Sequence, residues 1–371
     1  MEHLLSELFV QLDIYSAIQV VLLGFIGGVL SGFIGSGGAF FMTPGMMNIG
    51  VQGVVAVASN ITHKFGKAMV GSHKHGEMGN VDKKLAMFLL ITAAAGIRLA
   101  VWLSSLLFES GGDSHADKGA GANLYISLVF VGILTAVALS MVRDLRGGGG
   151  GNEEGGDSGP SRKIADALGR LNLPPMIYFK VADVKVSLWI LLLVGLATGY
   201  LAGTIGVGGF IGVPAMIYVF GIPTAVAAGT ELYLAMFMGA FGALNYAWAG
   251  YVDIRLTLLL YLGSLVGVHL GVYGVKVVNE RYIRMVTAVI ILLCVVSRAL
   301  AVPVYLRQLD ILAMSAALDP WFNGASKVML FGSGIGGTAI ILYQVTRAYR
   351  QRRRLKSSLA EPRTATQAVQ V

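Results

Sequence analysis

Polar residues interrupt two long apolar stretches of the sequence, and their side chains could contact a small anion. Hydroxyl and amide groups are supplied by Ser59, Asn60, Thr62, Thr230 and Tyr233. They could donate hydrogen bonds to an oxyanion or, alternatively, join neighbouring helices. The carboxylate of Glu231 would repel a dianion while ionised. We therefore expect Glu231 to exchange a proton or to pair with a basic residue.

Basic residues lie close to these polar groups in the sequence. His63, Lys64 and Lys67 are three and four positions apart, so Lys67 shares a helix face with the other two. We expect this face to attract anions or to gate their entry, unless the lysines extend to lipid headgroups instead. Arg98 lies within an apolar run and should face the interior, where its planar fork suits an oxyanion or a gating ion pair with Glu231.

Catalytic and metal-binding patterns are weak by comparison. His73, His75 and Glu77 form an H-x-H-x-E group, but a solvated loop explains it better than a metal site. The single cysteine, Cys294, excludes an intrachain disulfide and disfavours a cysteine-based metal or redox site. No Ser/His/Asp order, phosphate loop or HExxH motif is present. We expect neither an enzyme, nor a metal, nor a cofactor.

The elements that carry these residues are too apolar for a soluble domain. Of 371 residues, 55% are apolar and only 13% charged, whereas a soluble domain has about a quarter charged residues. Several runs approach the ~20 residues that cross a bilayer. The net charge of +8 is concentrated in short polar segments, which gives little support to a nucleic-acid partner. The predicted partners are a lipid bilayer and a small anion.

A glycine pattern organises these apolar runs. Residues 24–38 read GFIGGVLSGFIGSGG, and residues 195–209 repeat the spacing as GLATGYLAGTIGVGG, displaced by 171 positions. Glycines four apart favour close helix packing, and each copy ends in a G-x-G-G that should break the helix within the membrane. We expect the exposed amides of these breaks to contact substrate, unless they are only hinges. The residues concerned are Gly35, Ser36, Gly37, Gly38, Gly206, Gly208 and Gly209.

The same displacement relates residues well beyond the glycines, which indicates an internal duplication. It relates Ser59 to Thr230 and Asn60 to Glu231. It also relates Arg98 to His269, which is therefore a further candidate for gating or ion coupling.

Composition divides the chain into five segments. A flexible Gly-rich linker separates the two copies, and one further apolar run precedes a basic end. The predicted segments are a first transmembrane repeat (1–142), a cytoplasmic linker (143–185), a second transmembrane repeat (186–302), a loop with an extra C-terminal span (303–346) and a basic cytoplasmic tail (347–371).

Lys and Arg favour cytoplasmic loops, and this preference predicts the topology. It puts the linker, the loop after residue 70 and the C-terminal tail inside, and the acidic loop 109–121 outside. These assignments agree only if stretches 39–70 and 210–249 each enter and leave on one side. The two repeats then have opposite orientations. We therefore predict an all-α polytopic membrane protein with two inverted repeats, broken or re-entrant helices and an extra C-terminal span.

The sequence resembles the TauE/SafE family of sulfite exporters and related anion permeases. The resemblance rests on the doubled glycine pattern, on the segments TPGMMNIG and VPAMIYVFG after its two copies, and on the G-x-V-D before the following helix. It covers most of residues 17–300 and implies transport of a small anion, such as sulfite or a sulfonate, across the bacterial cytoplasmic membrane. A membrane anchor or regulatory subunit of a sulfur-metabolising or redox complex is the alternative.

Overall fold

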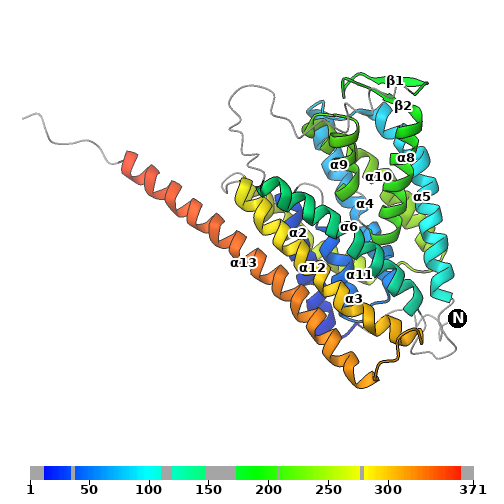
Figure 1. Ribbon diagram of the computed structural model, residues 1–371. Helices are drawn as coiled ribbons and strands as arrows, with labels where there is room; N and C mark the ends of the chain where they lie inside the picture. Colours follow the sequence, from blue (N-terminus) through cyan, green and yellow to red (C-terminus); the bar gives the residue numbers. More distant parts are fainter. Residues whose placement is uncertain are drawn as a thin grey trace, which may run out of the picture.

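The computed structural model describes residues 12–34, 38–109, 119–146, 173–206, 209–275 and 280–360 (Figure 1). Within these ranges eight helices are long and apolar enough to cross a membrane, so the chain is an all-α polytopic membrane protein. They are α2 (Ile14–Ile34), α5 (Lys83–Glu109), α6 (Ala120–Arg146), α8 (Leu188–Ile205), α10 (Thr224–Trp248), α11 (Ile254–Val275), α12 (Glu280–Gln308) and α13 (Asp319–Ala360).

Shorter or more polar helices complete the two halves. The first half contains α3 (Ala39–Asn48) and α4 (Gly53–Glu77), and the second contains α9 (Gly209–Pro214) and the π-helical turn Ala215–Val219. The helix starts repeat as the sequence does, since α4 and α10 begin 171 positions apart, as do α5 and α11. The duplication seen in the glycines therefore extends to the lengths and order of the helices.

Glycine seams join each half to the other. Along α2 and α11, a Cβ on Gly24 would lie 2.5 Å from the carbonyl oxygen of Leu260, and one on Gly28 would lie 2.5 Å from that of Ser264. The equivalent seam joins α8 to α5, where Gly195 approaches the backbone of Leu89. The backbones come this close because glycine has no side chain to separate them.

The central pair of equivalent helices, α4 and α10, runs in opposite directions. Gly242 of α10 lies against Ile61 of α4, whereas Gly71 of α4 lies against Leu232 of α10. Moving toward the C-terminus of α4 therefore means moving toward the N-terminus of α10. This antiparallel pairing places equivalent residues of the two halves at opposite levels of the bundle.

Both predicted helix breaks are present. The first lies between α2, which ends at Ile34, and α3. Gly38, at the start of α3, lies against Gly27 in the middle of α2, so α3 begins at mid-bundle and runs back along α2. The second follows α8, where Gly206 has a φ of +75° that favours glycine. Stretch 39–70 is thus one half-length helix followed by a long one, α4.

One element was not predicted. The end of the hydrophilic segment, expected to be linker, forms a hairpin of β1 (Met176–Phe179) and β2 (Val184–Ser187). The hairpin is fixed by Asp82, whose Oδ2 accepts hydrogen bonds from the amides of Val181 (3.0 Å) and Ala182 (3.2 Å). The Asp82 Oδ1 accepts from the amide of Leu85 and so caps α5.

This arrangement makes Asp82 important for the stability of the hairpin. Asp82→Ala removes three hydrogen bonds to a buried carboxylate, and we expect a loss of about 3 kcal/mol in stability. Limited proteolysis should then cut near residues 176–187 faster than in the unchanged protein. Lys185→Gln, on the exposed side of the same hairpin, is the control. Equal cleavage of both variants would show that Asp82 does not fix the hairpin.

The last helix differs from its predicted extent. The span was expected to end near residue 346, before a separate basic tail, but α13 continues as one helix to Ala360. The helix has 42 residues. Its first part packs along α12, and its C-terminal part projects beyond the bundle (Figure 1). Arg307 at the end of α12 pairs with Asp319 at the start of α13, 2.6 Å apart, and closes the turn between them.

Candidate functional site

The second helix break meets polar residues of the first half at the centre of the bundle. Asn60 of α4 donates to the hydroxyl of Thr43 (2.8 Å) and to the carbonyl of Ala39 at the start of α3 (3.0 Å). Thr43 in turn donates to the carbonyl of Ile205, the last residue of α8. Gly206 follows it, and a Cβ there would lie 3.0 Å from Asn60 Nδ2. These contacts place the end of α8 against the start of α3.

A buried carboxylate and a lysine complete the site. Glu231 of α10 is only 3% exposed, and its side chain packs against Gly212 of α9. Among the described residues neither of its carboxylate oxygens has a hydrogen-bond partner. Lys64, one turn beyond Asn60 on α4, interacts electrostatically with Glu231. Since α4 and α10 are antiparallel, Asn60 and its repeat equivalent Glu231 lie at different levels, and Lys64 is the residue that links them. We call Thr43, Asn60, Lys64, Gly206 and Glu231 together the central polar cluster.

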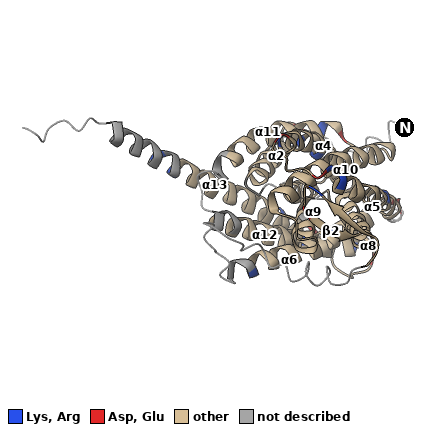
Figure 2. Ribbon diagram, turned by 90° about the horizontal axis from the view of Figure 1, so that it is seen from above, with Lys and Arg blue, Asp and Glu red and all other residues tan. Residues whose placement is uncertain are grey.

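A second layer of polar contacts continues along α4. Lys67 donates a hydrogen bond to Ser31 of α2, and it lies close enough to Lys64 for their charges to interact. His63 lies 2.7 Å from the hydroxyl of Ser264 on α11. Figure 2 shows a bundle that is mostly uncharged, with blue Lys and Arg segments near α4 and α10. The positive charge predicted for α4 is therefore half-buried between helices of both repeats.

Several predicted site residues have partners that account for them structurally. Ser59 donates to the carbonyl of Asp253, and Thr230 accepts from the amide of Asp82. These equivalent bonds join each long central helix to the turn before a helix of the other repeat. The hydroxyl of Thr62 bonds to Ala58 one turn back. The contacts of Ser59 and Thr230 are the inter-helix role that the sequence left open for them, whereas the bond of Thr62 stays within α4.

Tyr233 differs from these hydroxyl residues, because its recorded contact is aromatic. Its ring lies 5.1 Å from that of Phe237 in an edge-on arrangement.

Arg98 does not face the interior, contrary to the expectation for an arginine in an apolar run. It is exposed on α5 and donates to Asn245 of α10 (3.0 Å). Asn245 is three residues beyond Gly242, which packs against Ile61, so Arg98 lies near the level of Asn60 but on the outside of the bundle. The exposed Trp102 and Trp248 flank it at the same end of these helices. Arg98 thus resembles an anchor in the aromatic belt of a membrane interface.

The repeat partner of Arg98 is also exposed. His269 lies on the outer surface of α11, where its Nδ1 contacts the carbonyl of Leu265. The two equivalent residues are therefore not brought to the central polar cluster.

The exposed position of Arg98 leads to a prediction that differs from the one made from the sequence, in which Arg98 contacts the anion or Glu231. Since its side chain points away from the central polar cluster, Arg98→Ala should change the rate of substrate transport by less than about twofold, within the 0–1 kcal/mol expected of an exposed polar pair. The measurement is flux into proteoliposomes at matched protein density. A tenfold loss would place Arg98 on the substrate pathway.

The glycine breaks are described only in part. Gly35, Ser36, Gly37 and Gly208 lie outside the described residues. Gly38 is buried against α2, and Gly209 is the first residue of α9. The predicted contact of the break amides with substrate therefore stays a prediction.

Two buried residues escaped the sequence analysis. Thr43 was seen only as part of the TPGMMNIG segment, because its partner Ile205 is 162 positions away. Arg298 of α12 is 1% exposed and donates to Ser326 of α13. The sequence did carry a signal for Arg298, because an arginine within an apolar run usually faces the bundle interior and has a polar partner there. Its cluster with Asn48 and Ser297 joins α3, α12 and α13 and lies apart from the central polar cluster.

The H-x-H-x-E group lies at the exposed end of α4. His73 and Glu77 face each other there, 3.3 Å apart. In the described part of the chain no group of three His, Cys, Asp or Glu residues gathers as metal ligands do.

Comparisons with known proteins point to a membrane transporter. The family model "Sulfite exporter TauE/SafE" matches residues 20–298. Two relatives from Bacillus subtilis (strain 168) are named probable membrane transporter proteins. YjnA is 25% identical over 278 residues, 74% of this chain and 97% of its own length. YunE is 23% identical over 287 residues, 75% of this chain and 95% of its own length.

No solved structure matches the chain. The family model nevertheless covers well over half of it, including both helix breaks and the whole central polar cluster. The chain therefore belongs to the TauE/SafE family of membrane transporters.

Proposed function

We propose that the protein is a secondary transporter that carries a small sulfur oxyanion, such as sulfite or a sulfonate, through the central polar cluster. The observation that carries this proposal is the half-buried Lys64, one turn from Asn60, which is bonded to Thr43 at a helix break. Lys64 supplies the charge that a compact oxyanion requires, and the amide of Asn60 and the hydroxyl of Thr43 would donate to it once they release their present acceptors, the carbonyls of Ala39 and Ile205. The family name supports a sulfur-containing substrate.

Two oppositely oriented repeats suit the alternating access mechanism. The antiparallel pairing of α4 and α10 supports an inverted arrangement across the membrane. The glycine seams keep α2 with α11 and α8 with α5, and each pair takes one helix from each repeat. In the proposed cycle these two mixed pairs are the bodies that rock against each other about the central polar cluster.

Glu231 is the proposed coupling residue. Its carboxylate is buried, lacks a hydrogen-bond partner among the described residues and interacts with the same Lys64 that would contact the anion. Arrival of an anion at Lys64 would weaken the attraction between Lys64 and Glu231. A proton or another cation at Glu231 would then compensate the buried negative charge, which couples the two species.

The orientation of the protein in the membrane follows from the preference of Lys and Arg for the cytoplasmic side. In Figure 1 the hairpin, the end of α6 and the start of α12 lie toward the upper edge, and the turn between α12 and α13 lies at the lower edge. Lys83, Lys84 and Lys180 cluster at the hairpin. We assign this end to the cytoplasm, together with the C-terminus.

Counterflow in proteoliposomes tests the proposed function. Vesicles containing the purified chain are loaded with unlabelled sulfite, and uptake of ³⁵S-sulfite, taurine, sulfoacetate and sulfate is followed separately. We expect saturable, trans-stimulated uptake of at least one sulfite or sulfonate substrate. No uptake of any anion would exclude the transporter and favour an anchoring role. Uptake without trans-stimulation would indicate a channel.

A further inference from the structure

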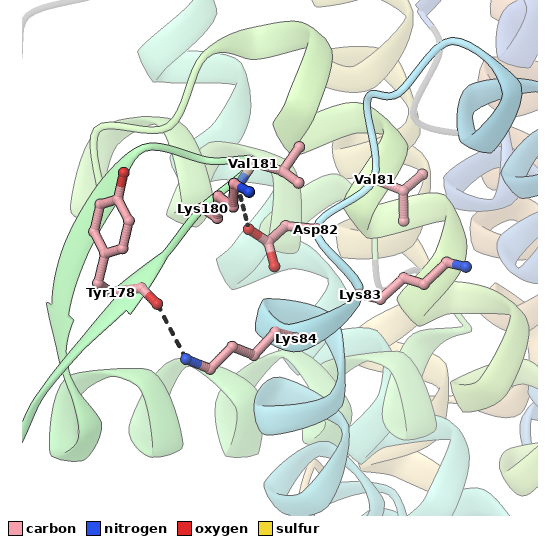
Figure 3. Close-up of a pocket in the computed structure, with 7 residues that line it drawn as sticks. All are labelled: Val81, Asp82, Lys83, Lys84, Tyr178, Lys180 and Val181. Atoms are coloured by element: carbon pink, nitrogen blue, oxygen red, sulfur yellow. Dashed lines mark hydrogen bonds between the residues drawn. The ribbon is translucent and has the colours of Figure 1, made fainter.

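A basic pocket lies between the hairpin and the start of α5, away from the central polar cluster. It has a volume of about 470 Å³. Figure 3 shows the lining residues, with the hairpin on one side and the start of α5 on the other. They are Val81, Asp82, Lys83, Lys84, Tyr178, Lys180 and Val181.

The pocket carries positive charge that the protein itself does not neutralise. Asp82 is the only acid in the lining, and it is buried with three backbone amides as donors. Lys84 is held against the pocket wall, because its Nζ donates to the carbonyl of Tyr178 (3.2 Å) and lies 5.5 Å from the Phe179 ring centre. No ion pair is recorded in the described structure for Lys83 or Lys180, and both are exposed.

Comparison of the two repeats shows that the duplicated fold does not require this pocket. The residue equivalent to Asp82 is Asp253, and Ile254 and Arg255 occupy the positions of Lys83 and Lys84. Arg255 turns back onto Asp253, with an N–O distance of 2.8 Å. In the first repeat the hairpin amides donate to the carboxylate of Asp82 instead. Lys84 therefore does not pair with Asp82 as Arg255 pairs with Asp253, and it donates to the carbonyl of Tyr178.

The pocket also lies at the level of the membrane surface. Lys83 begins the membrane-spanning helix α5, and Leu188, directly after β2, begins α8. Its rim is amphipathic, because Tyr178 and Val181 are exposed beside the lysines and Trp189 is exposed close by. Basic side chains next to exposed aromatic and apolar ones are typical of contact with lipid headgroups and upper acyl chains.

We propose that this basic pocket binds the headgroup phosphate of an anionic phospholipid. Lys180 approaches the phosphate from the hairpin, and Lys84 adds its charge from the wall. The exposed side chain of Lys83, which points away from the hairpin in Figure 3, turns toward the phosphate when the lipid binds. The bound lipid thereby joins the hairpin to α5. A soluble phosphate would meet the same lysines, but it would not use the exposed Tyr178 and Val181 beside them.

Lipid binding to the full chain in detergent tests the proposal. The probes are dihexanoyl phosphatidylglycerol, dihexanoyl phosphatidylcholine and inorganic phosphate, titrated separately and followed by native mass spectrometry. We expect the phosphatidylglycerol to bind about tenfold more tightly than the phosphatidylcholine. The variant Lys83→Gln/Lys180→Gln should lose roughly 30-fold in affinity for it, about fivefold for each lysine near the charge.

Lys185→Gln is the matched control, since Lys185 is an exposed lysine of the same hairpin that does not line the pocket. It should bind phosphatidylglycerol within twofold of the unchanged protein. Equal losses in both variants would mean that only general surface charge matters and would overturn the proposal. Inorganic phosphate that binds as tightly as phosphatidylglycerol would overturn it too, in favour of a soluble ligand. The readout is binding, so it does not depend on the transport substrate.

Discussion

Lys64→Gln should reduce kcat/KM for the transported anion by about 30- to 100-fold. The change removes the half-buried charge proposed to hold the anion, and a hydrogen bond to a charged group contributes about 1.5–3 kcal/mol. It also leaves the carboxylate of Glu231 buried without the cation that acts on it. The measurement is counterflow in proteoliposomes, with the amount of folded protein checked by size-exclusion chromatography.

The double variant Lys64→Gln/Glu231→Gln separates the two roles of Lys64. If the lysine only balances Glu231, removing both charges should restore counterflow, because counterflow needs no net proton movement. If the lysine holds the anion, the double variant should stay as slow as Lys64→Gln. We expect the second outcome. Restored counterflow would transfer the proposed anion contact from Lys64 to another residue.

Glu231→Gln alone completes this comparison. It should retain counterflow and lose accumulation driven by an imposed pH gradient, because the amide cannot take up a proton. A variant that still accumulates substrate in response to the gradient would remove Glu231 from the coupling mechanism.

The sequence could predict the backbone of this fold better than the directions of its side chains. Glycine spacing reports directly on how closely two helices approach, so the duplication and the breaks after Ile34 and Ile205 were readable from it. Where apolar residues lie on all sides of a helix, the sequence does not show which face is buried and which is exposed. Helix α5 is apolar on nearly all sides, and its sequence therefore did not show that Arg98 is exposed.

The central polar cluster was predicted in part, for a related reason. Asn60, Lys64, Gly206 and Glu231 stand out as polar or glycine residues within apolar stretches. Thr43 does not, because it becomes significant only through its bond to Ile205 of the other repeat. The hairpin was missed for the same reason. Asp82, which anchors it, is about 100 residues along the chain from the two hairpin amides that it binds.

Gly199→Val should prevent accumulation of folded protein altogether. Gly199 is on α8 and faces α5, where a Cβ would overlap with the carbonyl oxygen of Ala93. The obstacle is backbone, so the helices would have to separate along the whole seam. Overpacking usually costs 1–3 kcal/mol, and a backbone obstacle at a helix seam should cost about 3 kcal/mol or more. Thermal unfolding followed by size-exclusion chromatography measures the loss.

Gly132→Val provides the matched control for this seam. Gly132 lies within a membrane-spanning helix, α6, and a Cβ there would meet nothing within 4 Å. The same substitution should therefore leave the folded fraction nearly unchanged. Gly28 is the repeat equivalent of Gly199 and lies against Ser264 of α11, so Gly28→Val should match Gly199→Val rather than Gly132→Val. A stable Gly28→Val protein would mean that α2 and α11 can separate, and the rocking units proposed for transport would then need to be redrawn.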